Sequence, residues 1–269
     1  MATIPELASF ARLASALQPW LHQVVIIGGW AHRLYRLHPQ AQELDYAPLM
    51  TLDADVALPA KLPAPAQDIR QRLLANGFTA EFLGDARPPA THYRLGHEPS
   101  GFYAEFLTPL AGSEYDRGNR RKATVEIAGI TAQRLRYLEL LLQHPWQVDI
   151  NARECAAKVQ VANPASFLLQ KVLIHDRRDR DDRAKDILYM HDTLELFGSQ
   201  LAELRDEWQQ RIAPQLHPRT ATKVRQASRR LFSEVSDDIR RAALIPADRR
   251  LSPESIMEAC RFGFDRVFR

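Results

Sequence analysis

Asp53 and Asp55 are separated by one alanine within a stretch where apolar and polar residues alternate, residues 50–58. This alternation predicts a β-strand, and it places both carboxylates on the same face, about two residues' rise apart. Two carboxylates so placed can jointly bind one hard divalent cation, Mg²⁺ or Mn²⁺, with phosphate oxygens completing the shell. On its own, an Asp-x-Asp pair is more often the solvated face of an edge strand.

A pair of glycines forms a second candidate feature. Gly28 and Gly29 follow the apolar run of residues 24–27, which predicts a buried strand, and they precede a helical pattern. A turn of this kind presents backbone N–H groups and a helix N-terminus to an anion such as a triphosphate. The spacing matches neither a Walker loop nor a dinucleotide fingerprint, and an ordinary tight strand-to-helix turn is the simpler alternative.

A third acid, Glu105, lies among apolar residues in a stretch predicted to be a strand, residues 103–107. A carboxylate bracketed in this way is expected to find a cation or a hydrogen-bond network, although an exposed sheet face explains it equally well. Thr51 precedes the acid pair on its strand and could hydrogen-bond near a metal, but threonine is also simply a good β-former.

The order of these features resembles the polymerase-beta-type nucleotidyltransferase superfamily, with a Gly-Gly turn, a strand bearing two acids and a third acid on a later strand. Further along the chain, Phe167–Lys171 and Arg183-Ala184-Lys185-Asp186-Ile187 look like the Lys … Arg-x-Lys-Asp signature of AbiE-type (abortive-infection toxin) nucleotidyltransferases and their uncharacterised relatives. The matching motifs span residues 24 to about 190.

The resemblance implies a role for each matching residue. The catalytic carboxylates, which also hold the metal, would be Asp53, Asp55 and Glu105, and the last would help to deprotonate the attacking hydroxyl. The nucleotide-binding residues would be Gly28, Gly29, Lys171, Lys185 and Asp186. The chain departs from the family pattern after the glycines, because it has Trp30 where a small or hydroxylated residue is usual. An indole at that position is expected to narrow the phosphate pocket.

The activity implied is Mg²⁺-dependent transfer of a nucleoside monophosphate from an NTP, such as ATP, to an acceptor hydroxyl. An RNA end, particularly that of tRNA, is the first candidate acceptor, followed by a protein or a small molecule such as an aminoglycoside. Kinship also implies a toxin role, with a separately encoded antitoxin protein as partner. Two alternatives remain open: a non-catalytic nucleotide- or RNA-binding module of the same fold, which Trp30 favours, and a metal-dependent phosphohydrolase that uses the same acids.

Basic residues are concentrated in the second half of the chain. Residues 1–150 carry 14 Lys/Arg and 15 Asp/Glu, whereas residues 151–269 carry 22 and 18. The segment 219–230 has five bases and no acid, so it could grip a phosphate backbone or form a solvated helix face. Lys171 and Lys185 are 14 residues apart, which is close to four helical turns. They would share a face if one continuous helix contained both, or they could converge from two paired helices if the helix is interrupted between them.

The remaining pattern predicts an α+β protein, with a β-rich first part followed by an all-helical part. The resemblance implies that the first part is a nucleotidyltransferase-type mixed sheet flanked by helices. Strands are predicted at 78–83, 92–95, 123–127 and 130–135, and the runs 137–142 and 147–150 are ambiguous. A first helix is predicted after Thr3, which forms a capping box with Glu6, and it extends to about Leu17. Further helices are predicted at 30–38, 68–75, 165–175 and 183–197, with three or four more after residue 200. The expected domains are residues 1–155, the nucleotidyltransferase core, and residues 156–269, which contribute Lys171, Lys185 and Asp186 to the nucleotide site.

Composition supports a globular protein, because 45% of residues are hydrophobic and 26% are charged. No apolar run approaches the length of a membrane helix, and no secretory signal is recognisable, so we expect a cytoplasmic protein without a membrane partner. The two cysteines, Cys155 and Cys260, fit a reducing compartment, and the spacing of the histidines predicts no zinc site.

Overall fold

The computed structural model describes residues 7–63, 66–96, 101–115, 117–119, 122–152 and 155–269. The chain divides into two compact units, each described separately below. The sheet unit comprises Met1–His38 and Met50–Ala162, and the helical unit comprises Pro39–Leu49 and Asn163–Arg269. The α+β class predicted from the sequence is confirmed.

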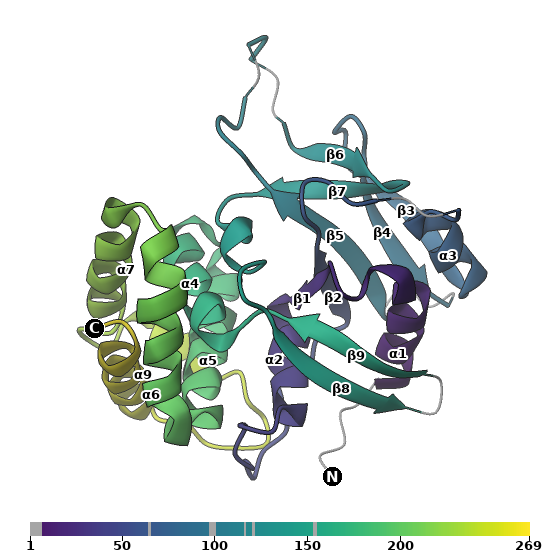
Figure 1. Ribbon diagram of the computed structural model, residues 1–269. Helices are drawn as coiled ribbons and strands as arrows, with labels where there is room; N and C mark the ends of the chain where they lie inside the picture. Colours follow the sequence, from purple (N-terminus) through teal and green to yellow (C-terminus); the bar gives the residue numbers. More distant parts are fainter. Residues whose placement is uncertain (1–6, 64–65, 97–100, 116, 120–121, 153–154) are drawn as a thin grey trace. The chain divides into compact units, whose positions relative to one another are not determined.

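The sheet unit is built on a nine-stranded mixed sheet (Figure 1), whose main path runs β3-β4-β5-β2-β1-β9-β8. The strands of this path are β1 (Val25–Ile27), β2 (Asp53–Ala57), β3 (Phe78–Leu83), β4 (Ala90–Leu95), β5 (Tyr103–Pro109), β8 (Trp146–Ala152) and β9 (Cys155–Val161). The hairpin of β6 (Thr124–Ile127) and β7 (Ile130–Leu135) joins the sheet where β7 pairs with β5. The first half of β5 therefore pairs with β4 and its second half with β7.

Alternation along the two central strands separates a buried face from a partly exposed one. On β2, Ala54 and Val56 are buried whereas both aspartates are partly exposed. On β5, Ala104 and Phe106 are buried whereas Tyr103 and Glu105 are partly exposed. β2 and β5 run parallel and in register, so these partly exposed side chains share one face.

In the described part of this unit, the sheet is accompanied by the α-helices α1 (Leu7–Ala16), α2 (Gly28–Leu34) and α3 (Ile69–Ala75). α1 contacts β8 and β9, and α3 contacts β3. Asp68 caps α3 by accepting a hydrogen bond from the Gln71 backbone N–H, in a capping box with the Gln71 side chain. Short 3₁₀ turns follow α1, α2 and β7 at Gln18–Trp20, Tyr35–Leu37 and Leu138–Leu140.

Most predicted strands of this unit are confirmed, with small shifts of their ends. The hairpin turn at Ala128-Gly129 is also confirmed, since both residues have positive φ angles, of 46° and 81°. The helix expected over 30–38 is instead α2, which starts earlier at Gly28 and gives way to a 3₁₀ turn. The predicted capping box at Thr3 and Glu6 lies outside the described residues.

The sequence analysis missed β9 and left β8 ambiguous. β9 (Cys155–Val161) is rich in alanine and polar residues, so its own pattern lacks a strand signal. It forms because β8 pairs with it antiparallel along its length and β1 pairs with it in parallel at Val161. Burial of Val159 and Val161 follows from those pairings.

The helical unit contains α4 (Pro164–Ile174), α5 (Arg180–Leu196), α6 (Leu201–Asp206), α7 (Pro218–Leu231), α8 (Asp237–Ala243) and α9 (Pro253–Val267). Short helical turns connect these helices at His175–Arg177, Gly198–Gln200, Glu207–Ile212 and Ala213–Gln215. The predicted cap of the first helix is confirmed, because Asn163 Oδ1 accepts a hydrogen bond from the Ser166 backbone N–H at 3.0 Å. α5 begins at Arg180 rather than at the predicted Arg183.

The segment Pro39–Leu49 belongs to the helical unit and is tied to it by polar contacts. The backbone N–H of Gln42 donates to Leu196 O at 3.0 Å, and the backbone N–H of Ala47 donates to Asp248 Oδ2 at 3.0 Å. Within the described residues, no helix is long and apolar enough to cross a membrane.

Candidate active site

The three predicted carboxylates come together on the partly exposed face of the sheet. Asp53 and Asp55 lie on β2, and Glu105 lies on β5 directly beside Asp55 in the parallel register. One carboxylate oxygen from each residue lies within 4.8 Å of the others. Strand alternation and register therefore bring together three acids that are far apart in the sequence.

The Gly28 turn lies against this carboxylate group. Gly28 has a φ of +60°, a conformation that glycine adopts without steric cost. A Cβ added at Gly28 would lie 2.0 Å from Asp55 Oδ2, so any side chain there would collide with the carboxylate. β1 pairs with β2 so that Ile27 lies beside Asp55, and the chain turns into α2 at the next residue. The close approach of turn and acid therefore requires glycine.

Trp30 points into the core of the sheet unit. Its ring stacks on Phe10 of α1 at 4.5 Å between centroids and meets Phe102 edge-on at 5.5 Å. The side chain is fully buried. The expectation that this indole narrows a phosphate pocket is thus not supported, because the ring packs against core aromatics.

Polar contacts fix the segment just before β2. The Thr51 hydroxyl donates a short hydrogen bond to Asp53 Oδ1. The buried Arg33 guanidinium donates to the Thr51 backbone carbonyl at 3.0 Å and lies over the Trp30 ring at 4.5 Å. The minor role considered for Thr51 thus has a geometric basis, and Arg33 supports Thr51 from the core.

Glu105 has two neighbours that the sequence analysis did not single out. The Gln133 side-chain amide, from β7, donates to Glu105 Oε2 at 2.8 Å. His92 Nε2, from β4, lies 3.5 Å from the same oxygen. Both neighbours arise from pairing of β5 with other strands, so no local motif marks them. These contacts hold one oxygen of Glu105 and restrict the orientation of its carboxylate.

The charges of this group affect a neighbouring phenol. The pKa of Tyr103 is raised to about 12, first by burial and then by the negative charges of Asp53, Glu105 and Asp55. Tyr103 therefore stays protonated at neutral pH and presents an O–H group rather than a further negative charge.

The donor set fits a hard divalent cation. Carboxylate oxygens are the protein ligands that Mg²⁺ and Mn²⁺ prefer, and three converging acids repel one another unless a cation is bound. Asp53, Asp55 and Glu105 would hold such an ion, and the Gly28 turn beside Asp55 leaves no side chain between the acid and the backbone N–H groups of α2.

The other predicted nucleotide-binding residues belong to the helical unit. Lys171 of α4 is buried, and its Nζ donates to Asp186 Oδ1 of α5 at 2.5 Å. Arg178 Nε lies 3.4 Å from the other oxygen of Asp186. Lys185 is exposed, whereas its neighbours Ala184 and Asp186 are buried. The charged segment at 175–179 interrupts the helix, so Lys171 and the Lys185-Asp186 pair lie on separate helices.

A second group of possible metal ligands was not foreseen, because the sequence analysis gave the histidines no such role. It consists of His191, Asp192 and Glu195 on α5. Arg249 Nη2 donates to both oxygens of Asp192 at 2.5 and 2.6 Å, and the Tyr46 hydroxyl donates to Glu195 at 2.5 Å. The acids are thus engaged by protein cations and donors, and the group fastens the 39–49 segment to α5.

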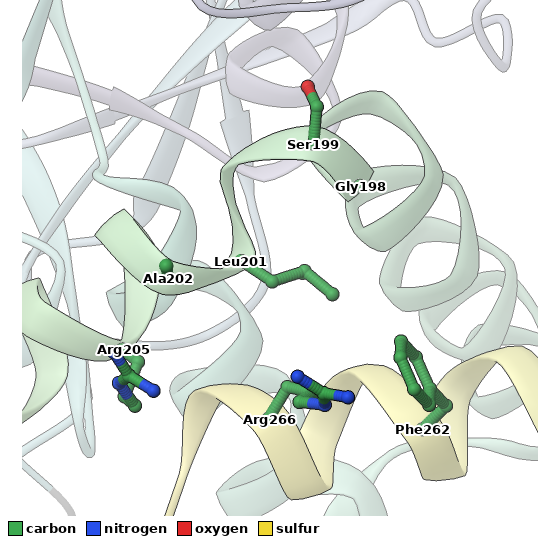
Figure 2. A pocket seen from close by; sticks show the side chains of 7 residues that line it. All are labelled: Gly198, Ser199, Leu201, Ala202, Arg205, Phe262 and Arg266. Carbon is green, nitrogen blue, oxygen red and sulfur yellow. The ribbon is translucent and has the colours of Figure 1, made fainter.

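Two cavities of the helical unit are lined by residues other than the predicted site residues. One, of about 180 Å³, lies between α6 and α9 and is lined by Gly198, Ser199, Leu201, Ala202, Arg205, Phe262 and Arg266 (Figure 2). Another, of about 170 Å³, lies beside α4 and α7 and includes His175 and Asp238. His175 Nε2 lies 3.5 Å from Asp238 Oδ2, and burial lowers the pKa of this histidine.

Comparison with known proteins identifies the family. A family model described as nucleotidyltransferase (NTP_transf_8) matches residues 6–213, which include the carboxylate group, the Gly28 turn and the Lys171–Asp186 pair. A search of curated proteins gives no match. The match covers well over half of the chain and agrees with the three-carboxylate geometry. The chain therefore belongs to this nucleotidyltransferase family and is a nucleotidyl-transfer enzyme.

Proposed function

We propose that this enzyme transfers a nucleoside monophosphate from an NTP to an acceptor hydroxyl in a reaction that requires Mg²⁺ or Mn²⁺. One observation carries the proposal: Asp53, Asp55 and Glu105 place carboxylate oxygens within 4.8 Å of one another, beside the Gly28 turn. A bound divalent ion would neutralise phosphate charge and polarise the α-phosphoryl group.

The residues of the chain then have distinct tasks. Asp53, Asp55 and Glu105 would hold the ion, with Thr51 donating to Asp53, and the backbone N–H groups at the Gly28 turn would contact the phosphates. Glu105 accepts the proton of the acceptor hydroxyl as the new oxygen–phosphorus bond forms. The bond between the α- and β-phosphates breaks, and pyrophosphate leaves with its electron pair.

The resemblance to AbiE-type enzymes adds Lys171, Lys185 and Asp186 to the proposal as nucleotide-binding residues of the helical domain. Burial of Lys171 against Asp186 supports an organised role for the pair, because a lysine with only a surface role would extend into solvent. Lys185→Ala is expected to weaken NTP binding measured by filter retention. A control substitution at Lys158, an exposed lysine of β9, should leave binding unchanged.

An RNA end, with tRNA first, is the proposed acceptor. α7 carries five basic residues and no acid, and the side chains of Arg219, Lys223 and Arg225 are exposed. This helix lies beyond residue 213, where the family match ends. A cationic helix added to a nucleotidyl-transfer core suits a polyanionic acceptor. By kinship, the reaction serves as the toxin activity of a toxin–antitoxin pair.

The non-catalytic binding module is the weaker alternative. It drew its support from Trp30, and that side chain is buried in the core. A pure binder of phosphates also has no physical need for three converging carboxylates.

The test uses each α-³²P-labelled NTP with Mg²⁺ and offers total RNA, total protein and a panel of aminoglycosides. The Asp53→Asn/Asp55→Asn variant keeps the shape of both side chains, and Asp149→Asn is the control at an exposed acid of β8. We expect label in RNA, a loss of at least about 100-fold in the double variant, and abolition by EDTA.

Other outcomes decide between the alternatives. Label in protein or an aminoglycoside instead of RNA would replace the acceptor while keeping the chemistry. Loss of NTP without any labelled acceptor would indicate a phosphohydrolase. Full transfer by the double variant would contradict the assignment of the carboxylates.

A further inference from the structure

The sheet order defines two sides of the carboxylate group. β1, with the Gly28 turn, flanks β2 on one side, and β4 flanks β5 on the other. In phosphoryl transfer the attacking and leaving oxygens lie roughly in line across phosphorus. If the departing pyrophosphate lies at the Gly28 turn, the acceptor must approach from the side of β5 and β4. This step rests on the proposed function.

Three side chains form a stack on that side of the face. The ring of His92 lies on the ring of Tyr103, with centroids 4.5 Å apart and planes inclined by 18°. The Arg94 guanidinium lies 5.4 Å from the Tyr103 ring centre. All three come from facing positions on β4 and β5, where Arg94 pairs with Tyr103 and His92 with Glu105. We call this group the β4–β5 stack.

The β4–β5 stack is adjacent to the catalytic acids and reachable by solvent. His92 Nε2 lies 3.5 Å from Glu105 Oε2, and the side chains of His92 and Arg94 are 19% and 18% exposed. The next residue of β4 on this face is Ala90, which is small and partly exposed, and the Gln133 side chain approaches Glu105 from β7. A planar group that extends the stack past His92 would therefore lie close to Glu105.

We propose that the β4–β5 stack binds the terminal nucleotide of the RNA acceptor, with its base stacked on the outer face of the His92 ring, which itself lies on the Tyr103 ring. Such a contact tolerates every base, because each has a π-face. The sugar hydroxyl of the stacked nucleotide then lies near Glu105, the acid that takes its proton. Arg94, held at 2.8 Å by Glu81, contributes positive charge on the approach side.

Cross-strand aromatic pairs also stabilise sheets, and this is the alternative explanation of the stack. The two explanations differ in what they predict for RNA. A structural pair affects the melting temperature alone, whereas a nucleotide platform affects RNA affinity and the environment of the terminal base.

The test uses a synthetic RNA hairpin with a single-stranded 3′ tail that ends in a 2-aminopurine ribonucleotide. Binding to the wild-type enzyme without NTP should quench 2-aminopurine fluorescence through stacking. Tyr103→Leu removes one ring and should abolish the quenching and raise the KM for RNA about tenfold, with a much smaller change in kcat. Tyr103→Phe keeps the ring and should retain the quenching and the KM for RNA.

Further variants separate stacking from folding. His92→Leu removes the other ring and should also abolish quenching and raise the KM for RNA, and it should lower kcat as well because His92 contacts Glu105. His92→Phe should restore quenching and KM without restoring the contact with Glu105. Phe82→Ala removes an exposed aromatic from the opposite face of β3 and should change neither reading. Melting temperatures identify any variant that is unfolded. If Tyr103→Leu is unfolded, the comparison of His92→Leu with His92→Phe decides whether the ring binds the base.

The outcomes distinguish this inference from the proposed function. Normal quenching and normal KM in both Tyr103→Leu and His92→Leu, with RNA still labelled, would overturn the platform and leave the transferase intact. A wild-type enzyme that labels only protein or aminoglycosides would overturn the RNA acceptor, and the platform with it.

Discussion

Replacing Gly28 with alanine perturbs the candidate site at its tightest point. The new Cβ would stand 2.0 Å from Asp55 Oδ2, whereas ordinary contacts begin at 3.4 Å. The Asp55 carboxylate must therefore retreat by about 1.4 Å, or the turn must move by the same amount. The first movement separates Asp55 from Glu105, and the second separates the Gly28 turn from both acids.

The magnitude follows from two effects. A misplacement of about 1 Å at a reacting centre costs roughly 100-fold in rate, so we expect kcat/KM to fall by at least about 100-fold. Alanine at a φ of +60° also destabilises the backbone by about 1–2 kcal/mol. For a unit of this size, that corresponds to a decrease in melting temperature of roughly 2–8 °C.

Gly77→Ala is the matched control for backbone strain. Gly77 has a φ of +84°, but a Cβ there would meet nothing closer than Arg12 Nη1 at 3.7 Å. It should lose similar stability and keep its activity. Label transfer and thermal unfolding are measured on both variants. Equal activity in Gly28→Ala and Gly77→Ala would refute the reasoning, because the contact with Asp55 would then have no catalytic consequence.

Two further predictions concern a positioning residue and a buried histidine. Gln133→Leu removes the amide that donates to Glu105 Oε2 at 2.8 Å, so it should lower kcat about tenfold while the KM for NTP stays unchanged. Gln133→Glu places a like charge beside Glu105 and should lower kcat further. An unchanged kcat in both variants would exclude a positioning role. Burial lowers the pKa of His175, against the opposing effects of Asp238, Asp186 and Asp176. Below about pH 6.5 the unfolded chain therefore takes up a proton at this histidine more readily than the folded chain, so the melting temperature should fall between about pH 7.5 and pH 5.5. His175→Gln should make that fall smaller. An identical pH dependence in the variant and the wild type would contradict this.

The convergence of Asp53, Asp55 and Glu105 was predictable because residue type, alternation and order in the chain all point to the same arrangement. Asp53 and Asp55 share a face on any strand that contains both, and parallel pairing with β5 then needs only the correct register to add Glu105. The Gly28 turn was predictable for a similar reason, since strand, glycine pair and helix are consecutive. Its close contact with Asp55 was not, because the pairing of β1 with β2 sets that distance.

The supporting residues could not be found from the sequence. Gln133 lies 28 residues from Glu105, and neither its type nor its surroundings indicate a contact with an acid. The same holds for Arg33, whose role depends on burial beneath Trp30 and on a carbonyl 18 residues away. Local propensity also failed at β9, where pairing with β8 imposes a strand on an alanine-rich segment.

The position of Glu105 on β5 explains why these supporting residues converge there. β4 pairs with β5 through Glu105, whereas β7 pairs with β5 only from Leu107 onward. Glu105 therefore lies where one neighbouring strand ends its pairing and another begins. Such a junction lets side chains of two different strands, His92 and Gln133, reach the same carboxylate oxygen. A uniformly paired strand would offer Glu105 a neighbour from a single strand on that side. The change of partner along β5 is therefore what lets two strands hold one oxygen of the same acid.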